Sequence, residues 1–380
     1  MRREAEDFAV RVHRPVFRAP QHTATIDEVI ELAGTAFESG LVPKAAARVM
    51  RSTGVETRAF VRPAKELFTV GSGPALWRET VELMAALAHD AAVSALAAAQ
   101  LAPEDVDALV VTSVTGWVMP GVDARLIHSL GLRPTVRRLP VATIGCAGGL
   151  FGLVRAREQI AVEPGARILV VAAEAFSISF QPGNISMPAM IYKALGGDGV
   201  AAAVVTDTDD VRPGPAVELS DPLELLVPDT AEDYRLTVDE PTGHIGFTST
   251  AEAPYAILKA APHLSPWLGR RPTPPAFVVA HHGGPAILER TASVLDCDRE
   301  TLRHSWDSLR EWGNMSSVSV LDVLARTLDD PAGPQPGEEG LMLSIGPGVT
   351  IEAARLRCVE APATVDGGSN FNNGVFSKHD

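Results

Sequence analysis

The side chains best suited to chemistry are a cysteine, a histidine and an asparagine that lie far apart in the chain: Cys146, His281 or His282, and Asn314. An imidazolium lowers the pKa of a neighbouring thiol, and the thiolate can then attack a thioester to form an acyl-enzyme. A carboxamide adds a neutral N–H donor that stabilises an enolate oxygen without quenching the thiolate. Because the set contains no carboxylate, it suits decarboxylation of a malonyl thioester and carbon-carbon bond formation better than hydrolysis.

The sequence around Cys146 predicts a strand that delivers the thiol to the first turn of a helix. Residues 141–144 form a short β-branched run, Gly145 permits a sharp reversal, and residues 147–160 carry apolar side chains at helical spacing. Unpaired backbone N–H groups and the helix dipole favour a thiolate at such a position. A structural interpretation stays open for each of the three side chains, as a buried thiol, a hydrogen-bonded histidine at a strand end and a helix N-cap.

Two parts of the chain repeat one pattern. Residues 108–116 and 276–284 are apolar runs of strand length that end in a glycine-containing loop, and residues 340–348 resemble residues 168–173. We therefore predict an α/β fold built from two duplicated halves, with the corners that carry the three side chains facing one crevice.

The predicted halves have defined limits. The N-terminal half spans residues 1–207 and carries the cysteine, and the C-terminal half spans residues 208–360 and carries the histidine and the asparagine. Residues 361–380 contain little that could form a core, and we predict a flexible tail.

Composition excludes several function classes. The 380 residues are 46% apolar and 21% charged, which describes a globular protein, and no run of eighteen apolar residues occurs. We expect a cytoplasmic protein with no membrane partner. A net charge of -14 argues against nucleic acid as a partner, and three widely spaced cysteines indicate neither a disulfide framework nor a metal site.

One segment departs from the acidic character of the chain. Between residues 44 and 65 the basic residues outnumber the single acid, Glu56, and they are Lys44, Arg48, Arg51, Arg58, Arg62 and Lys65. The cluster is either a solvated helix face or a docking site for the phosphates of coenzyme A or of a phosphopantetheinyl carrier.

Several segments together resemble the type III polyketide synthases, the chalcone and stilbene synthase family. The matching segments are Gly145-Cys-Ala-Gly-Gly149, His281-His-Gly-Gly-Pro-Ala-Ile-Leu288, Gly313-Asn-Met-Ser-Ser317 and Gly346-Pro-Gly-Val-Thr-Ile351, with Val118-Met-Pro-Gly121, Gly131-Leu-Arg-Pro134 and Gly197-Asp-Gly199 in the same order. The resemblance implies a thiolase-like five-layer αβαβα fold and a homodimer. It also implies repeated decarboxylative condensation of malonyl-CoA onto an acyl thioester starter, giving pyrone or phenolic and resorcinolic products, with no cofactor beyond coenzyme A thioesters and no metal.

Carried over by position, Cys146 resembles the nucleophile of the family, His281 its catalytic histidine and Asn314 the third member. His282 stands where the family usually has proline. Arg48 matches a coenzyme A phosphate contact, whereas Lys44 and Arg51 match the other basic contacts only loosely, so that an acyl carrier protein is a further candidate donor.

The resemblance also assigns a substrate pocket. Met119 resembles a methionine that reaches into the cavity of the partner subunit, and Phe247 a phenylalanine at the cavity entrance. Four more residues match positions that line the elongation cavity: Thr115, Ile178, Ser179 and Ser316. Gly196 replaces the gatekeeper phenylalanine in the usual Leu-Phe-Gly-Asp-Gly segment, and we expect this loss to open the cavity junction and to admit a bulky or long-chain starter.

Two alternatives share the same fold. A ketoacyl-acyl carrier protein synthase of the initiating kind has the same three side chains and stops after one condensation. A non-catalytic thiolase-fold protein would only bind acyl carriers.

Overall fold

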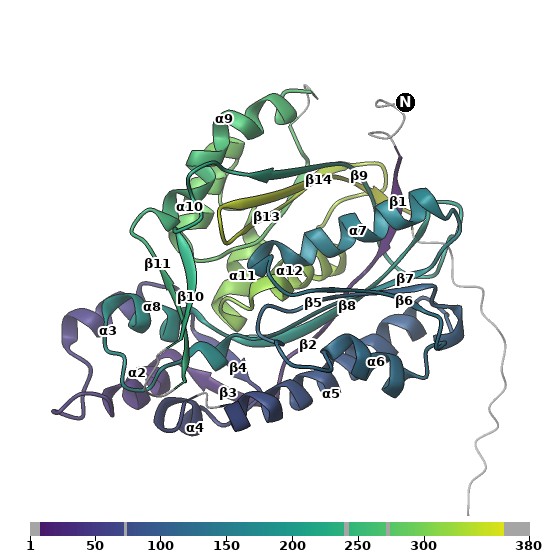
Figure 1. The fold of residues 1–380 in the computed structure, drawn as a ribbon. Coiled ribbons are helices and arrows are strands. Elements are labelled where there is room, and N and C mark those ends of the chain that lie inside the picture. The colour runs from purple at the N-terminus through teal and green to yellow at the C-terminus, as the bar shows by residue number, and fades with distance from the viewer. Residues whose placement is uncertain (1–7, 72–73, 239–242, 271–273, 361–380) are drawn as a thin grey trace, which may run out of the picture.

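The computed structural model describes residues 8–71, 74–238, 243–270 and 274–360 (Figure 1). The predicted tail, residues 361–380, lies outside the described residues.

One mixed sheet contains most of the strands, in the order β12-β13-β14-β9-β1-β8-β7-β5-β6, with β2 pairing on β8. The strands on the N-terminal side are β1 (Val10–His13), β2 (Val16–Arg18), β5 (Ala108–Thr112), β6 (Arg137–Val141), β7 (Ile168–Ala175) and β8 (Asp198–Asp207). The others are β9 (Ala216–Leu226), β12 (Phe277–Ala280), β13 (Glu339–Gly346) and β14 (Thr350–Val359).

The strands on the two sides of the β1 and β9 pair follow equivalent orders: β1, β8, β7 and β5 on one side correspond to β9, β14, β13 and β12 on the other. β5 runs parallel to β7, and β12 runs parallel to β13. β7 pairs antiparallel with β8, as β13 does with β14, and β1 and β9 close each half before pairing with each other. This topology is the α/β fold of two duplicated halves that the sequence predicts. We propose that the halves divide between residues 207 and 208, where β8 ends.

Alternate residues of the strands enter different layers. Val110 and Val170 point toward a central core that contains α7 (Gly148–Val162) and α12 (Ser319–Asp329), whereas Leu109 and Leu169 pack under α5 (Pro74–Ala98) and α6 (Val122–Leu130). On the far side, α9 (Ala256–Leu268), α10 (Pro285–Leu295) and α11 (Arg303–Trp312) cover the C-terminal strands. The layers are therefore αβαβα, as predicted (Figure 1).

Helix α5 is long and apolar enough over Leu76–Ala98 to cross a membrane by length and composition alone. Such a helix is weak evidence for a membrane span, because the core helix of a globular protein has the same properties. Ala88, Ala92 and Ala95 of α5 are buried in the core that the helix forms with the sheet.

Smaller elements surround the site. They are β3 (His22–Thr25), β4 (Thr57–Phe60), α2 (Ile26–Gly34), α3 (Lys44–Arg51), α4 (Ala64–Thr69), α8 (Met187–Leu195), β10 (Tyr234–Val238) and β11 (Ile245–Ser249). Short 3-10 turns occur at η1 (Pro103–Asp105), η2 (Gly145–Ala147), η3 (Phe176–Ser179), η4 (Ala253–Tyr255) and η5 (Ser316–Val318).

The strand before the cysteine lies earlier than predicted. β6 ends at Val141, and residues 142–144 are not part of the sheet. The partner strand β5 ends at Thr112, opposite Val141, so the β-branched run that follows has no strand to pair with.

Candidate active site

Cys146 lies in the single turn η2, directly before α7. Gly145 has a φ of +58° and packs against Pro347, where a Cβ atom would be too close to the proline ring. Gly149 packs equally closely against Ser317 and Val320, because a Cβ atom there would lie 2.7 Å from Cγ1 of Val320. Gly145 thus lets the cysteine turn approach Pro347, after β13, and Gly149 lets the start of α7 approach the segment that follows Asn314.

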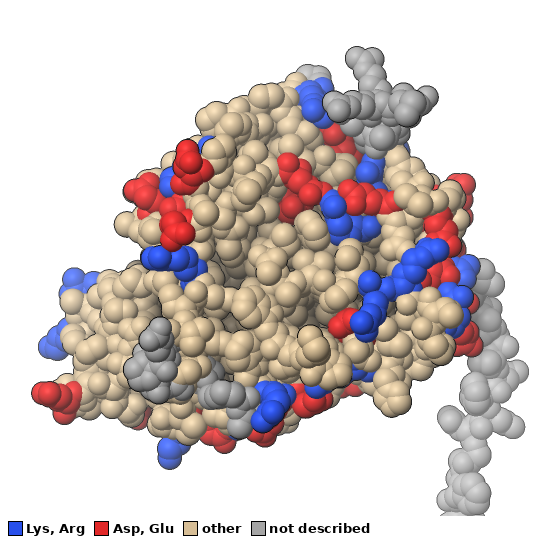
Figure 2. All heavy atoms as spheres, viewed as in Figure 1, with Lys and Arg blue, Asp and Glu red and all other residues tan. Residues whose placement is uncertain are grey.

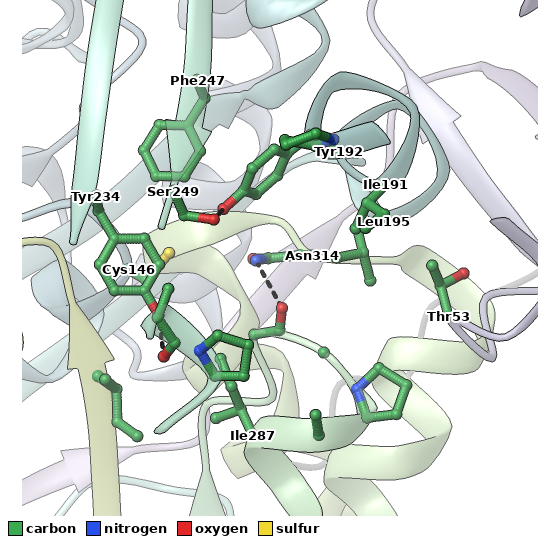
Figure 3. A pocket seen from close by; sticks show the side chains of 18 of the residues that line it. Thr53, Cys146, Ile191, Tyr192, Leu195, Tyr234, Phe247, Ser249, Ile287 and Asn314 are labelled. Atoms are coloured by element: carbon green, nitrogen blue, oxygen red, sulfur yellow. Dashed lines mark hydrogen bonds between the residues drawn. The ribbon is translucent and has the colours of Figure 1, made fainter. Parts of the chain in front are cut away.

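Asn314 is held by its backbone, which leaves the carboxamide available. Its N–H donates to the carbonyl oxygen of Leu195 at 2.7 Å, and its carbonyl oxygen accepts from the N–H of Gly197 at 3.1 Å. Oδ1 accepts from the N–H of Ser316 at 2.8 Å, which turns the amide nitrogen toward the cavity, 3.5 Å from the carbonyl oxygen of Gly283. In Figure 3 this carboxamide and the sulfur of Cys146 point into one pocket.

His281, rather than His282, lines that pocket. It follows β12, its backbone N–H donates to the carbonyl oxygen of Leu343, and the residue is 2% exposed. The ring of His282 is fully buried, and its Nε2 lies 3.2 Å from Oγ of Ser308. The fold therefore brings together the three side chains that the resemblance selects.

In the unliganded site, the protonation states of Cys146 and His281 differ from the expected thiolate and imidazolium. Burial raises the pKa of the Cys146 thiol to about 12, although hydrogen bonds with Ser316 and Asn314 oppose this shift. Burial lowers the pKa of His281 to about 3. The unliganded site thus contains a neutral thiol and a neutral imidazole, and the expected imidazolium is not the resting form.

Two cavities meet at Cys146. The larger has a volume of about 520 Å³, is mostly apolar and extends from Thr53, two residues after α3, to the thiol (Figure 3). The smaller has a volume of about 70 Å³ and lies on the side of Trp117 and Val114. Cys146, Phe247 and Pro347 line both cavities.

Comparison with known proteins matches both parts of the chain to one family. Residues 69–209 match the description "Chalcone and stilbene synthases, N-terminal domain", and residues 255–360 match the corresponding C-terminal domain. The chain is 33% identical to 1,3,6,8-tetrahydroxynaphthalene synthase of Streptomyces coelicolor over 89% of its own length and 90% of the relative. The chain belongs to the chalcone and stilbene synthase family.

Further relatives agree with this assignment. Phloroglucinol synthase of Pseudomonas fluorescens is 29% identical over 88% of this chain and 95% of that protein. The crystal structure of the Streptomyces coelicolor tetrahydroxynaphthalene synthase, described as a bacterial type III polyketide synthase, superposes with a TM-score of 0.82 at 30% identity, covering 92% of this chain and 99% of that chain. The protein is a type III polyketide synthase, and thus an acyltransferase with the thiolase-like fold.

Sequence reasoning missed a buried carboxylate in the synthase. Glu174, at the end of β7, accepts hydrogen bonds from the N–H groups of Val114 and Thr115 and from the hydroxyls of Thr115 and Ser317, the last at 2.6 Å. Burial raises its pKa to about 7, and its charge adds to the raised pKa of Cys146. An acid inside an otherwise apolar strand was the signal that could have revealed it.

We expect Glu174→Gln to increase the rate at which iodoacetamide alkylates Cys146 by about tenfold at pH 8, because one pKa unit less on the thiol gives about ten times more thiolate. Since the pKa of Glu174 is about 7, the difference should disappear as the pH falls below 7 and the carboxyl is neutral in the wild type. Half-buried Cys297 serves as the internal control. A rate ratio that is constant with pH would exclude the charge effect.

Most of the predicted pocket residues line one of the two cavities at Cys146. Thr115, Ile178, Ser179, Ser316 and Phe247 line the smaller cavity, and Phe247 also lines the larger one. Two tyrosines that the sequence did not single out, Tyr192 and Tyr234, line the larger cavity near Cys146.

Two of the predicted pocket residues, Met119 and Gly196, line neither cavity. Met119 is 97% exposed and lines neither cavity of this subunit. Gly196 lines neither cavity, and the space beside it is not open. A Cβ atom on Gly196 would lie 3.0 Å from Cε1 of Phe176 and closer still to its Cδ1, so another aromatic ring fills the space.

The basic segment is only partly a surface patch. Lys44, Arg48 and Arg51 are exposed on α3 and border a cavity of about 530 Å³ with Asp27, to which Arg51 is paired at 2.8 Å. Basic atoms lie at the left edge in Figure 2, where Figure 1 places α3. Arg58, in contrast, is fully buried and contributes nothing to the patch. Among the described residues, no group of His, Cys, Asp or Glu side chains could hold a metal ion.

Proposed function

We propose that the synthase transfers an acyl group from a coenzyme A thioester to Cys146 and extends it with malonyl-CoA by decarboxylative condensation. The observation that carries this proposal is the position of Cys146, His281 and Asn314 on one mostly apolar cavity. Water-poor surroundings strengthen the hydrogen bonds that an enolate needs. The two named relatives make polyhydroxylated aromatic products, which favours phenolic products of several condensations over the product of a single condensation.

The proposed steps use the neutral forms found in the resting site. As the sulfur attacks the starter thioester, His281 accepts the thiol proton and returns it to the departing coenzyme A. Malonyl-CoA then loses CO2, and the enolate oxygen accepts hydrogen bonds from the amide nitrogen of Asn314 and from His281, in the tautomer that carries its proton on the ring nitrogen facing the cavity. The enolate carbon attacks the acyl carbonyl and the Cys146 thiolate leaves, so that the chain, now two carbons longer, is carried on coenzyme A. The thiolate then attacks the next thioester, or takes up a proton from water and returns to the neutral resting form.

The substrate would enter from the side of α3. Val49, Ser52 and Thr53 of this region line the larger cavity, while Lys44, Arg48 and Arg51 lie on the exposed face of the same helix. A phosphate group on α3 and a thioester at Cys146 could therefore belong to one extended molecule, coenzyme A or the arm of an acyl carrier protein. We also propose a homodimer in which exposed Met119 enters the partner subunit, and we propose no further cofactor.

We expect Arg48→Ala to raise KM for malonyl-CoA about tenfold with little change in kcat, because a charge-assisted hydrogen bond to phosphate contributes to binding and not to the chemistry. Steady-state kinetics with a phosphate-free malonyl pantetheine thioester tests the cause, since its KM should be unchanged. Lys65→Ala, at an exposed basic residue on α4, is the matched control. Equal effects of Arg48→Ala on both substrates would contradict a phosphate contact.

A further inference from the structure

Residue 196 must be glycine because a side chain would collide with its neighbours, and not because of its backbone conformation. Gly196 has φ of -68° and ψ of 141°, which any residue can adopt. A Cβ atom there would nevertheless collide with the ring of Phe176 and lie 3.1 Å from Cε1 of Phe180. A side chain at residue 196 and the ring of Phe176 would therefore need the same space, and only one of them can be present.

Phe176 belongs to a cluster of aromatic rings beside Cys146. Its ring stacks on Tyr192 with centroids 6.1 Å apart and meets Phe247 edge-on at 5.8 Å. Phe247 also contacts Tyr192 at 5.0 Å and Tyr234 at 6.2 Å, and Figure 3 shows these three side chains around the sulfur. Phe176 faces the smaller cavity, Tyr192 faces the larger one, and Phe247 faces both.

The backbone next to Phe176 is held by Asp198, the first residue of β8 and two residues after Gly196. Asp198 accepts hydrogen bonds from the N–H of Ser177 at 2.8 Å and from its hydroxyl at 2.6 Å. The same carboxylate accepts from the N–H of Val61 at 3.0 Å. Phe176 itself is 6% exposed, so its ring is packed against neighbouring side chains and has no open solvent into which to move.

We propose that Phe176 determines specificity by closing the junction between the two cavities, so that it limits the starter and the growing chain that Cys146 can hold. The smaller cavity, at about 70 Å³, leaves room for only a short acyl group while this ring is present. The proposal rests on the proposed function, because it concerns the acyl chain on Cys146.

The test compares Phe176→Ala with the wild type, using acetyl-CoA or octanoyl-CoA as starter and malonyl-CoA as extender. We expect Phe176→Ala to raise the ratio of kcat/KM for octanoyl-CoA to that for acetyl-CoA by about tenfold or more, and to shift the products toward longer polyketides. Because Phe→Ala in a core can prevent folding, Phe176→Leu is a second variant that keeps apolar volume and should shift the ratio in the same direction by less.

A double variant checks the shared site. Gly196→Phe alone should impair all starters, because the added ring collides with Phe176 on the loop that holds the backbone of Asn314. Phe176→Ala with Gly196→Phe should restore activity and the ratio of kcat/KM values for the two starters found in the wild type. Unchanged selectivity and product length in folded Phe176→Ala and Phe176→Leu, both still acylated on Cys146, would overturn the inference alone. Absence of acylation in the wild type would instead overturn the proposed function.

Discussion

His281→Ala and Asn314→Ala are each expected to reduce malonyl-CoA decarboxylation by about 10² to 10³ in kcat, the usual cost of removing one donor to a developing oxyanion. The two side chains are the N–H donors that line the cavity beside the thiol, and the enolate formed by loss of CO2 has no other proposed stabilisation. Acetyl-CoA formation from malonyl-CoA, followed by chromatography, measures the step directly.

Two further variants serve as controls for this result. His282→Ala removes the neighbouring imidazole, which bonds to Ser308 and lines neither cavity, and it should retain decarboxylation. Asn314→Asp keeps an oxygen for the N–H of Ser316 but loses the donor, and it should be as impaired as Asn314→Ala. Full decarboxylation by folded Asn314→Asp would show that the carboxamide N–H is not needed.

Cys146→Ala is expected to abolish condensation, with a loss of more than about 10⁴, while malonyl-CoA decarboxylation continues. The reason is that the thiol forms the acyl-enzyme, whereas the imidazole and the carboxamide stabilise the enolate. Product formation and acetyl-CoA formation, measured on the same preparation, separate the two roles. Equal loss of both reactions in a folded variant would show that the thiol also supports the decarboxylation step.

The three side chains of the candidate site and the duplication were predictable because each depends on a short segment. Cys146, His281 and Asn314 each follow an apolar run or a glycine, and the sheet places equivalent runs in equivalent positions. The resemblance to the family decided between His281 and His282, which the local pattern left open.

Features that depend on contacts between distant segments were not predictable. Gly196 suggested an open junction because the ring that fills it comes from Phe176, twenty residues earlier in the chain. The resting charges of Cys146 and His281 follow from burial by several elements, and Glu174 acquires its partners from two other segments. The run after Val141 had strand propensity, but its partner strand ends too early to pair with it.

If Cys146 carries the growing acyl chain, its sulfur must be acylated before condensation. Intact-protein mass spectrometry with peptide mapping, after incubation with acetyl-CoA, detects this acyl-enzyme. We expect an acetyl adduct on Cys146 that is consumed when malonyl-CoA is added and that is absent from Cys146→Ala. An adduct confined to Cys297 or Cys358, or product formation without any adduct on Cys146, would contradict it.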